Sequence, residues 1–552
     1  MTALAVAAPT PSRDGCEGRR ITAIGYRHGA PSVPARTPGV PDGAQRIANR
    51  LLVGTPTVPA AIRPFLLFRE GDWCLERRRS ESERLLRLLP YIADATIHAE
   101  PDGPDGVRLD VVVFDDVRST VELLFDGATP RTVAVTNRSV GGRGQLVRGS
   151  WTRGTPFRSG VGGTFRDYHL MGQPVTGTVT IDRFPLGGYQ EVSAARPLLS
   201  DEQWSGWRAL VIDADHFLRY RTASGERPAL RVRRQVADLD AVARISSGPV
   251  RWFAGGEIAY DRIRPDADGV LIADEGLVAP TDPALAQRYP ARSGVRIGPV
   301  LGVRALSFVK VRGFDALAGA QDLGRGVQFV ARALHEVTGA ARQDLEVQGF
   351  AGRGDSLRYA AWQGITAVRQ RSDGRSAVVA TGRLAAYRHP TASRTSLLQF
   401  DYAAAWRSDL PFQLSFADRP GALRGFEGSR ATGGQRVTLL AEHRELIASP
   451  HPRLALAVAG FMNAGRIWAV DVPYGSNATR ASVGASLIGA SPRNSRSSVR
   501  LDLAVPLTPD PRVRPVNVRV AFSIVPRRFW IESEEIRLAH RAGPVEGTFV
   551  WP

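Results

Sequence analysis

The sequence offers few groups of residues that could carry out chemistry. Asp213, Asp215 and His216 could bind a metal, but the same residues suit a hydrated strand or turn better. Gly141–Gly144 lacks the Lys and the Ser or Thr of a phosphate-binding loop. The sequence contains neither a Gly-x-Ser-x-Gly elbow before a helix nor a His-Glu-x-x-His motif. It therefore predicts no catalytic residue, no metal site and no cofactor.

From about residue 119, the elements that must position any site are short alternating strands and turns. In the clearest run, 516–524, valine, phenylalanine and isoleucine occupy every second position, with Asn, Arg, Ala and Ser between them. The runs 499–507, 436–444, 454–458 and 294–304 show the same period, which places one strand face in lipid or core and the other in water. A soluble β-sandwich would show this period too. However, more than about 400 residues of strand and turn suit a barrel of about 16 strands better.

The first ~118 residues show helix patterns as well as strand patterns, unlike the rest of the chain, and predict a separate small domain over 21–118. The expected elements, in order, are a strand at 21–26, a short helix at 59–68, an amphipathic helix at 75–89, and strands at 95–100 and 107–114. The turn-rich segment 101–106 separates the last two strands. Strand, helix, helix, strand, strand predicts an α+β domain with one sheet face covered.

Charge and cysteine content narrow the possible partners. The net charge of +18 is carried almost wholly by arginine, and Lys310 is the only lysine. A genome rich in Arg codons would give this excess, and so would an interior lined with guanidinium groups or a surface facing anionic lipid. The arginines are scattered rather than gathered on one helix or tail, so nucleic acid is not an expected partner. Cys16 and Cys74 are too few for a disulfide framework, and whether they pair stays open.

The two ends of the chain carry weaker signals. No stretch approaches 18 apolar residues, so no membrane-spanning helix is expected. Met1–Pro9 resembles only the end of an export signal, so the natural start is expected further upstream, and 1–20 is expected to be a signal remnant or disordered. The expected barrel covers 119–530 and ends at Phe529 and Trp530. Residues 531–552 form an extension expected to cap the interior or to be disordered.

Motifs near both ends carry a family resemblance. Leu423–Glu427 (LRGFE) precedes a run with Glu442, His443 and Arg444, and Phe461–Gly465 (FMNAG) and the strand–loop–strand segment 482–507 follow. In this order and spacing, they resemble the C-terminal half of the BamA/TamA superfamily of outer-membrane barrels, or bacterial surface antigens. The N-terminal part resembles a polypeptide-transport-associated (POTRA) domain in the segments 68–72, 81–90 and 93–97. The segment 137–144 is similar to the first barrel strand of the family. Residues 150–400 match only as a generic barrel.

The resemblance implies a latch inside the barrel. Arg424 would lie on a loop folded into the interior and reach acids on the inner wall, one of which matches Glu442. The second family position is usually Asp, but this chain has Asn463, which can accept a hydrogen bond and brings no charge. The latch would therefore be weaker or rely on Glu442, which shares a strand face with Arg436 and Arg444. An exposed Arg-Gly turn is the alternative. The implied residues are Arg424, Gly425, Phe426, Glu442, Asn463 and Gly465.

The resemblance also implies a place and a role. The chain would lie in the outer membrane of a Gram-negative bacterium, with its first domain in the periplasm, and would insert or export proteins. A single POTRA-like domain favours an accessory paralogue. Its partners would be unfolded outer-membrane or secreted clients, outer-membrane lipid and lipopolysaccharide. Clients would enter at a seam between the first strand, near 131–137, and the last, 516–524. The alternatives are a transport pore, a structural barrel, and a lipid hydrolase using Ser and His on the barrel wall.

Overall fold

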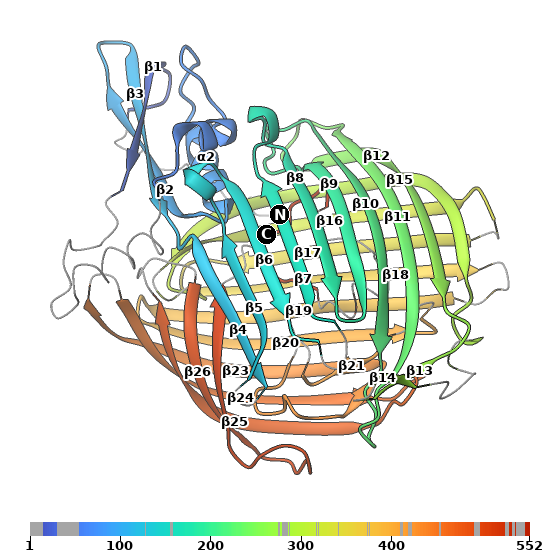
Figure 1. Ribbon diagram of the computed structural model, residues 1–552. Helices are drawn as coiled ribbons and strands as arrows, with labels where there is room; N and C mark the ends of the chain where they lie inside the picture. Colours follow the sequence, from blue (N-terminus) through green and yellow to red (C-terminus); the bar gives the residue numbers. More distant parts are fainter. Residues whose placement is uncertain are drawn as a thin grey trace, which may run out of the picture.

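The computed structural model describes residues 15–29, 55–126, 129–154, 158–273, 276–278, 285, 287–315, 317, 319–339, 342–371, 374, 376–408, 412–417, 422–451, 454–490, 497–524, 529–532, 536 and 547–552. Within these ranges, the N-terminal part forms a small mixed sheet with a helix, and the rest forms one large antiparallel sheet (Figure 1). No helix in these ranges is both long enough and apolar enough to cross a bilayer.

The small sheet contains three described strands in the order β1-β3-β2. β1 (Arg20–His28) pairs in parallel with β3 (Gly106–Asp115), and β2 (Ile92–Pro101) pairs antiparallel with the other side of β3. The three strands expected from the sequence are therefore present. β1 and β2 are the two edges of this sheet, which matters below because sheet edges can pair with another chain.

One helix, α2 (Glu76–Leu88), covers this sheet and supplies its core. Leu85 and Leu86 of α2 are buried against alternate residues of β3 such as Leu109 and Val111. The expected helix at 59–68 is instead two short 3-10 turns, η1 (Pro59–Ala61) and η2 (Arg63–Phe65). Pro59 stands at the first helical position, where proline is tolerated, but Pro64 lies inside the expected helix, where it lacks an N–H and prevents one continuous helix.

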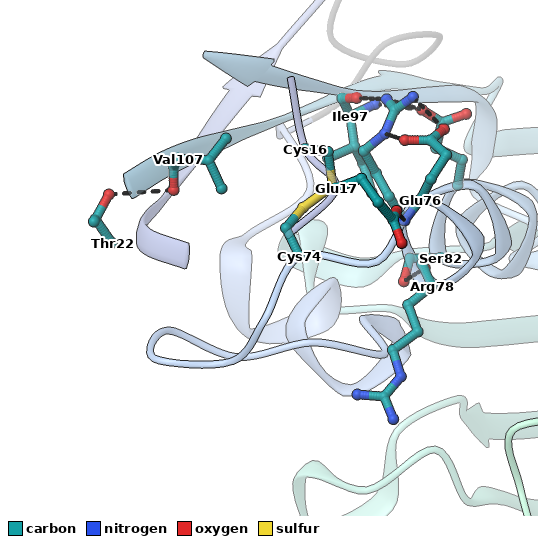
Figure 2. Close-up of a disulfide and its surroundings, with 11 residues drawn as sticks. Cys16, Glu17, Thr22, Cys74, Glu76, Arg78, Ser82, Ile97 and Val107 are labelled. Carbon is teal, nitrogen blue, oxygen red and sulfur yellow. Dashed lines mark hydrogen bonds and ion pairs between the residues drawn. A yellow bond between two sulfur atoms is a disulfide. The ribbon is translucent and has the colours of Figure 1, made fainter. Parts of the chain in front are cut away.

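A disulfide ties the start of the chain to the start of α2. Cys16 and Cys74 are bonded, with Cα atoms 5.4 Å apart across a sequence separation of 58 (Figure 2). Beside it, a carboxylate oxygen of Glu17 accepts the backbone N–H of Glu76 at 2.9 Å. Residues 15–20 are therefore an ordered part of the domain, whereas the sequence was expected to form a signal remnant or a disordered segment over 1–20, of which 1–14 lie outside the described residues. The expected signal remnant at 1–9 lies outside the described residues.

Among the described residues, the large sheet has 22 strands. They are β4 (Ser119–Asp126), β5 (Thr129–Asn137), β6 (Gln145–Thr152), β7 (Gly160–Asp167), β8 (Thr176–Phe184), β9 (Gly187–Arg196), β10 (Ser205–Arg219), β11 (Pro228–Arg244), β12 (Arg251–Pro265), β13 (Val270–Ala273), β14 (Gly276–Val278), β15 (Arg292–Arg312), β16 (Ala320–Glu336), β17 (Arg342–Gly354), β18 (Arg358–Arg371), β19 (Ser376–Thr391), β20 (Arg394–Trp406), β23 (Gln435–His451), β24 (Leu454–Trp468), β25 (Ala478–Ala490), β26 (Ser497–Pro506) and β27 (Asn517–Ile524). In the strand order, β27 lies next to β4, and β9 next to β10, so the order forms a ring.

The sheet has more strands than the expected 16 or so. β13 and β14 form a side hairpin, because β12 pairs directly with β15. In addition, β4 to β9 are only 8 to 10 residues long, so the chain fits more strands into the same length. The first strand is β4, and the expected seam strand at 131–137 lies within β5. Part of the segment thought to resemble a first strand, 137–144, is a turn, because Gly141, Gly142 and Gly144 have positive φ.

The two faces of the large sheet differ in chemistry. On β26, Val499, Leu501 and Leu503 are 41–50% exposed on the outer face, whereas Asp502 is 3% exposed on the inner face. β15 alternates in the same way, with Leu301 exposed and Arg304 buried. A soluble sandwich would bury the apolar face and expose the charges. Here the apolar residues point outward, and the charges point toward the enclosed interior.

Candidate functional site

The candidate site is built on a loop between β20 and β23 that folds against the inner face. Two short strands within it, β21 (Leu414–Ser415) and β22 (Thr432–Gly433), pair with each other and bring the loop ends together. Phe426 is fully buried in an apolar cluster with Phe416, Leu423 and Ile467. These contacts hold the loop tip, Leu423–Glu427, against the inner face of the sheet rather than in solvent.

Glycine allows the loop tip to approach the wall. Gly425 has a φ of +88°, a left-handed conformation that other residues rarely adopt. A Cβ placed on Gly425 would lie 3.1 Å from the Cβ of Ala504 in β26. Gly465 plays a similar part on β24, because an added Cβ would lie 2.8 Å from a ring carbon of Phe416. Both glycines therefore make room for contact between loop and wall.

Glu442 on β23 is the centre of the site and binds three guanidinium groups. Its Oε2 accepts a hydrogen bond from Arg424 at 2.7 Å and another from Arg500 at 2.7 Å, and its Oε1 accepts one from Arg444 at 2.8 Å. The Glu442 side chain is 2% exposed. Arg500 also donates to Asp502 at 2.6 Å. We call these five residues the Glu442 centre. A carboxylate has about four acceptor positions, which is enough for three donors.

Arg424 makes further contacts through its guanidinium group and its backbone carbonyl. Its guanidinium lies 4.4 Å from the ring centroid of Phe461, within cation–π range. Its carbonyl oxygen lies 2.6 Å from the hydroxyl of Ser482, which is also 3.1 Å from Oδ1 of Asn463. Asn463 therefore meets the loop through Ser482, whereas the charge facing Arg424 comes from Glu442.

The same loop tip reaches the last strand of the sheet. The side-chain amide of Asn517 donates to the carbonyl of Gly425 at 3.2 Å, and Arg519 donates to Glu427 at 3.2 Å. The tip thus contacts β23 through Glu442, β25 through Ser482, and β27 through Asn517 and Arg519. It acts as a brace across the end of the sheet.

The sequence identified part of this arrangement. It placed Arg424 and Glu442 together only through the family resemblance, and it assigned Arg436 and Arg444 to one face. Arg444 pairs with Glu442, whereas Arg436 donates to the Ser415 carbonyl. Arg500 was not linked to Glu442. Its inward position in the alternating run was the available signal, but β26 lies three strands from β23 in the order.

A second set of ion pairs lines the inner face of β10 to β17, and we call it the wall network. Most of its pairs join neighbouring strands, whereas Arg342–Asp344 lies within β17 and Arg332–Glu257 spans from β16 to β12 across β15. They are Arg208–Asp238 at 2.8 Å, Arg208–Asp240 at 2.8 Å, Arg332–Glu257 at 3.1 Å, Arg332–Glu346 at 3.0 Å, Arg296–Asp261 at 3.3 Å and Arg342–Asp344 at 2.7 Å. Acids match the arginines here, so this part of the wall is not simply a positive surface.

The candidate metal residues do not converge. Asp215 is paired with Arg231 at 2.6 Å, and Asp213 is exposed on the same side of β10. His216 lies on the opposite side by alternation. In the part of the chain that the structure describes, no three His, Cys, Asp or Glu residues are close enough together to hold a metal ion.

Comparison with known proteins gives distant likenesses only. No family model matches the chain, and no curated protein matches it. Among solved structures, it is similar to CdiB from Escherichia coli, with 11% identity over 92% of this chain and 76% of that chain and a TM-score of 0.46. It is also similar to BamA from Haemophilus ducreyi lacking POTRA domains 1-3, with 12% identity over 92% and 85% and a TM-score of 0.37. Likenesses this distant do not establish a function, which must come from the chain's own contacts.

Proposed function

We propose that the chain is an outer-membrane β-barrel that inserts or exports other proteins, as an accessory relative of the BamA/TamA type. The observation that carries this proposal is the brace formed by the loop tip. The loop tip binds Glu442 through Arg424. It also binds the last strand, β27, through Asn517 and Arg519. A brace across the end of the strand ring suits a barrel whose first and last strands must part and rejoin.

The chemistry of the sheet supports a membrane location. Apolar side chains cover the outer face, and ionised groups are paired on the inner face. In water, this would leave a wide apolar surface exposed, far beyond the patches usual on soluble monomers. In a bilayer, the same surface meets lipid tails, and a ring of strands leaves no unpaired backbone edge in the hydrocarbon.

The small domain is proposed to lie in the periplasm and to collect clients. The Cys16–Cys74 disulfide suits an oxidising compartment. The outer edge of β1 is bonded to the segment 71–74 at Ile21, and that of β2 is bonded to α2 side chains at Ala95 and Ile97. An extended client segment could pair with the rest of either edge through backbone hydrogen bonds, so many sequences would be accepted. No nucleotide is needed, since the work would come from folding and burial of the client.

The seam is proposed between β4 and β27, in place of the 131–137 strand expected from the sequence. Both strands have 8 residues, whereas β15 has 21. Shorter strands form fewer backbone hydrogen bonds and open at lower cost. Val518 and Val520 on β27 are 68% and 70% exposed, more than Val499 or Leu501 on the neighbouring β26. A client strand could pair with either edge and be templated there.

The alternatives have less support. A passive pore needs an open interior, whereas the loop tip folds in against the inner face of this one and is held there by the Glu442 centre. A lipid hydrolase needs Ser and His together. The one such pair among the described contacts, Ser396 and His443 at 2.9 Å, faces outward, with no acid bonded to the imidazole.

Fractionation of expressing cells is the first experiment. An outer-membrane fraction with a gel mobility shift on boiling is expected, and a soluble protein without a shift would overturn the barrel. The seam is then tested with paired cysteines, one at Val121 or Leu123 and the other at Val518 or Val520. The Cys16–Cys74 pair is left intact.

The stapled chain is reconstituted in vesicles with a urea-denatured outer-membrane barrel as client. Client folding should stop when the disulfide forms and return after reduction. A matched staple between β6 and β7, Gly149→Cys with Gly163→Cys at directly opposed positions, should leave client folding unchanged. Unimpaired folding with the β4–β27 staple would refute the seam.

A further inference from the structure

The C-terminal segment of the chain lies inside the large sheet. Phe549 is 2% exposed and Trp551 is 6% exposed. Both belong to an apolar cluster on the inner face with residues such as Phe253 and Phe350. Figure 1 places the C-terminus within the outline of the sheet. The described end of the extension, 547–552, is therefore a packed part of the structure.

The backbone of this segment is held by one isolated β-bridge and by side-chain donors. The carbonyl of Thr548 accepts the N–H of Leu198 at 2.8 Å, and Phe549 forms a parallel bridge with Leu198. The carbonyl of Val550 accepts Arg304 at 3.3 Å and Gln328 at 3.2 Å. Hydrogen bonds to the backbone do not depend on side-chain identity. This part of the contact would therefore hold many extended peptides.

Glycines on the wall make room for the side chains. A Cβ placed on Gly302 of β15 would lie 2.7 Å from the Phe549 ring. One placed on Gly324 of β16 would lie 2.6 Å from the Cβ of Pro552. Phe549 also packs edge-on against Phe253, with ring centroids 5.5 Å apart. The wall is thus shaped to this segment, and its specificity lies in the aromatic positions.

The segment borders a cavity that the small domain also lines. This cavity has a volume of about 230 Å³ and is lined by Trp551 and Pro552 and by Arg84 and Leu88 of α2. A peptide bound in place of the segment would therefore lie close to the small domain.

We propose that the inner face of β12, β15 and β16, with Leu198, is a binding site for an extended peptide that has aromatic residues at alternate positions. The chain's own segment, 547–552, occupies this site in the structure. The site borders the Glu442 centre, because Arg444 and Arg500 line the same cavity as Trp551 and Pro552. Its wall residues are not members of that centre, and it does not depend on the role proposed above. The segment thereby acts as an internal ligand that a peptide of the same chemistry must displace.

The test uses a labelled peptide with the sequence of residues 547–552 (GTFVWP) and two purified chains, the full one and one ending at Glu546. Fluorescence anisotropy should show binding to the shortened chain at least tenfold tighter than to the full chain. The reason is that a tethered ligand competes at an effective concentration on the order of millimolar. A peptide with alanine in place of Phe549 and Trp551 should bind neither chain.

A wall variant keeps the test specific. Gly302→Val should weaken peptide binding to the shortened chain at least tenfold, because its side chain fills the Phe549 position. Gly460→Val is the matched control, since an added Cβ there meets nothing within 4 Å. Both variants must keep the mobility shift on boiling. Equal binding to both chain lengths, or equal binding of the alanine peptide, would overturn the proposal. Client folding in vesicles is measured separately, so failure of one proposal does not imply failure of the other.

Discussion

At the scale of single residues, Glu442 matters more than Arg424. Removing Arg424 leaves Glu442 bonded to Arg444 and Arg500, so Arg424→Ala should cost about 1.5–3 kcal/mol, the value of a hydrogen bond to a charged group. Glu442→Gln leaves three guanidinium groups around a neutral amide and should cost about 3–5 kcal/mol. The readout is the temperature at which the folded gel band is lost. A larger effect for Arg424→Ala, or wild-type behaviour in both variants, would contradict this ranking.

The same residues show how far sequence reasoning could go. The family resemblance predicted the contact between Arg424 and Glu442, and the alternation predicted which residues of each strand face inward. Neither could supply Arg500, because its contact with Glu442 depends on the stagger and curvature of four successive strands. Ser482 and Asn517 were missed for a similar reason. They bind the backbone of the loop, and a backbone carbonyl leaves no pattern in a sequence.

At the scale of elements, the disulfide should stabilise the small domain and leave the large sheet unaffected. Cross-linking residues 58 apart removes chain entropy worth about 4 kcal/mol from the unfolded domain. In the double variant Cys16→Ser with Cys74→Ser, trypsin should cut the N-terminal domain at least tenfold faster. The mobility shift on boiling should stay at its wild-type temperature. Unchanged cleavage would mean that the core around Leu86 holds the domain without the bond.

A buried ion pair contributes to the docking of α2 on the large sheet, beside a second pair between Asp94 of β2 and Lys310 of β15 at 2.7 Å. Arg87 donates to both carboxylate oxygens of Asp322, at 2.9 and 2.7 Å, and the two side chains are 4% and 8% exposed. Burial lowers the pKa of Arg87, but the hydrogen bond and charge of Asp322 outweigh it, so the pKa stays raised. Arg87 should therefore remain charged throughout the physiological pH range.

Breaking this pair should release the small domain. Arg87→Ala leaves Asp322 uncompensated and should cost about 3–5 kcal/mol of docking free energy. Amide hydrogen exchange in α2 and at the start of β16 should rise together. Arg77→Ala is the control, because Arg77 is 69% exposed and its bond to Glu202 should contribute under about 1 kcal/mol. Equal exchange in the two variants would mean that other contacts carry the docking instead, such as the cation–π contact of Arg84 with Phe308 and the ion pair of Asp94 with Lys310.

At the scale of the whole molecule, period-two alternation was enough to predict a large antiparallel sheet after residue 119. It was not enough to count its strands. Strand length is set by where turns close. The chain uses strands of 8 to 10 residues before residue 196, mostly strands of 13 to 21 residues between 205 and 490, and strands of 10 and 8 residues at the end. The alternation also could not tell lipid from core on the apolar side. To tell lipid from core, one must know which strand face is exposed. The sequence of a single strand does not show this, because it depends on how the strands are arranged in the sheet.

The outward apolar face gives the sharpest test of the whole architecture. Leu501 is 41% exposed on the outer face of β26. If that face meets lipid, Leu501→Arg should cost about 2–4 kcal/mol near the bilayer midplane and lower the fraction that folds into vesicles. If the face met water, an arginine there would be harmless. Met171→Arg is the matched control, since Met171 is 93% exposed in the turn η4 (Leu170–Gly172) rather than on a strand. The folded fraction, scored by the mobility shift before boiling, should fall for Leu501→Arg and hold for Met171→Arg. If both variants fold as well as wild type, the apolar face is not in lipid, and the membrane assignment fails with it.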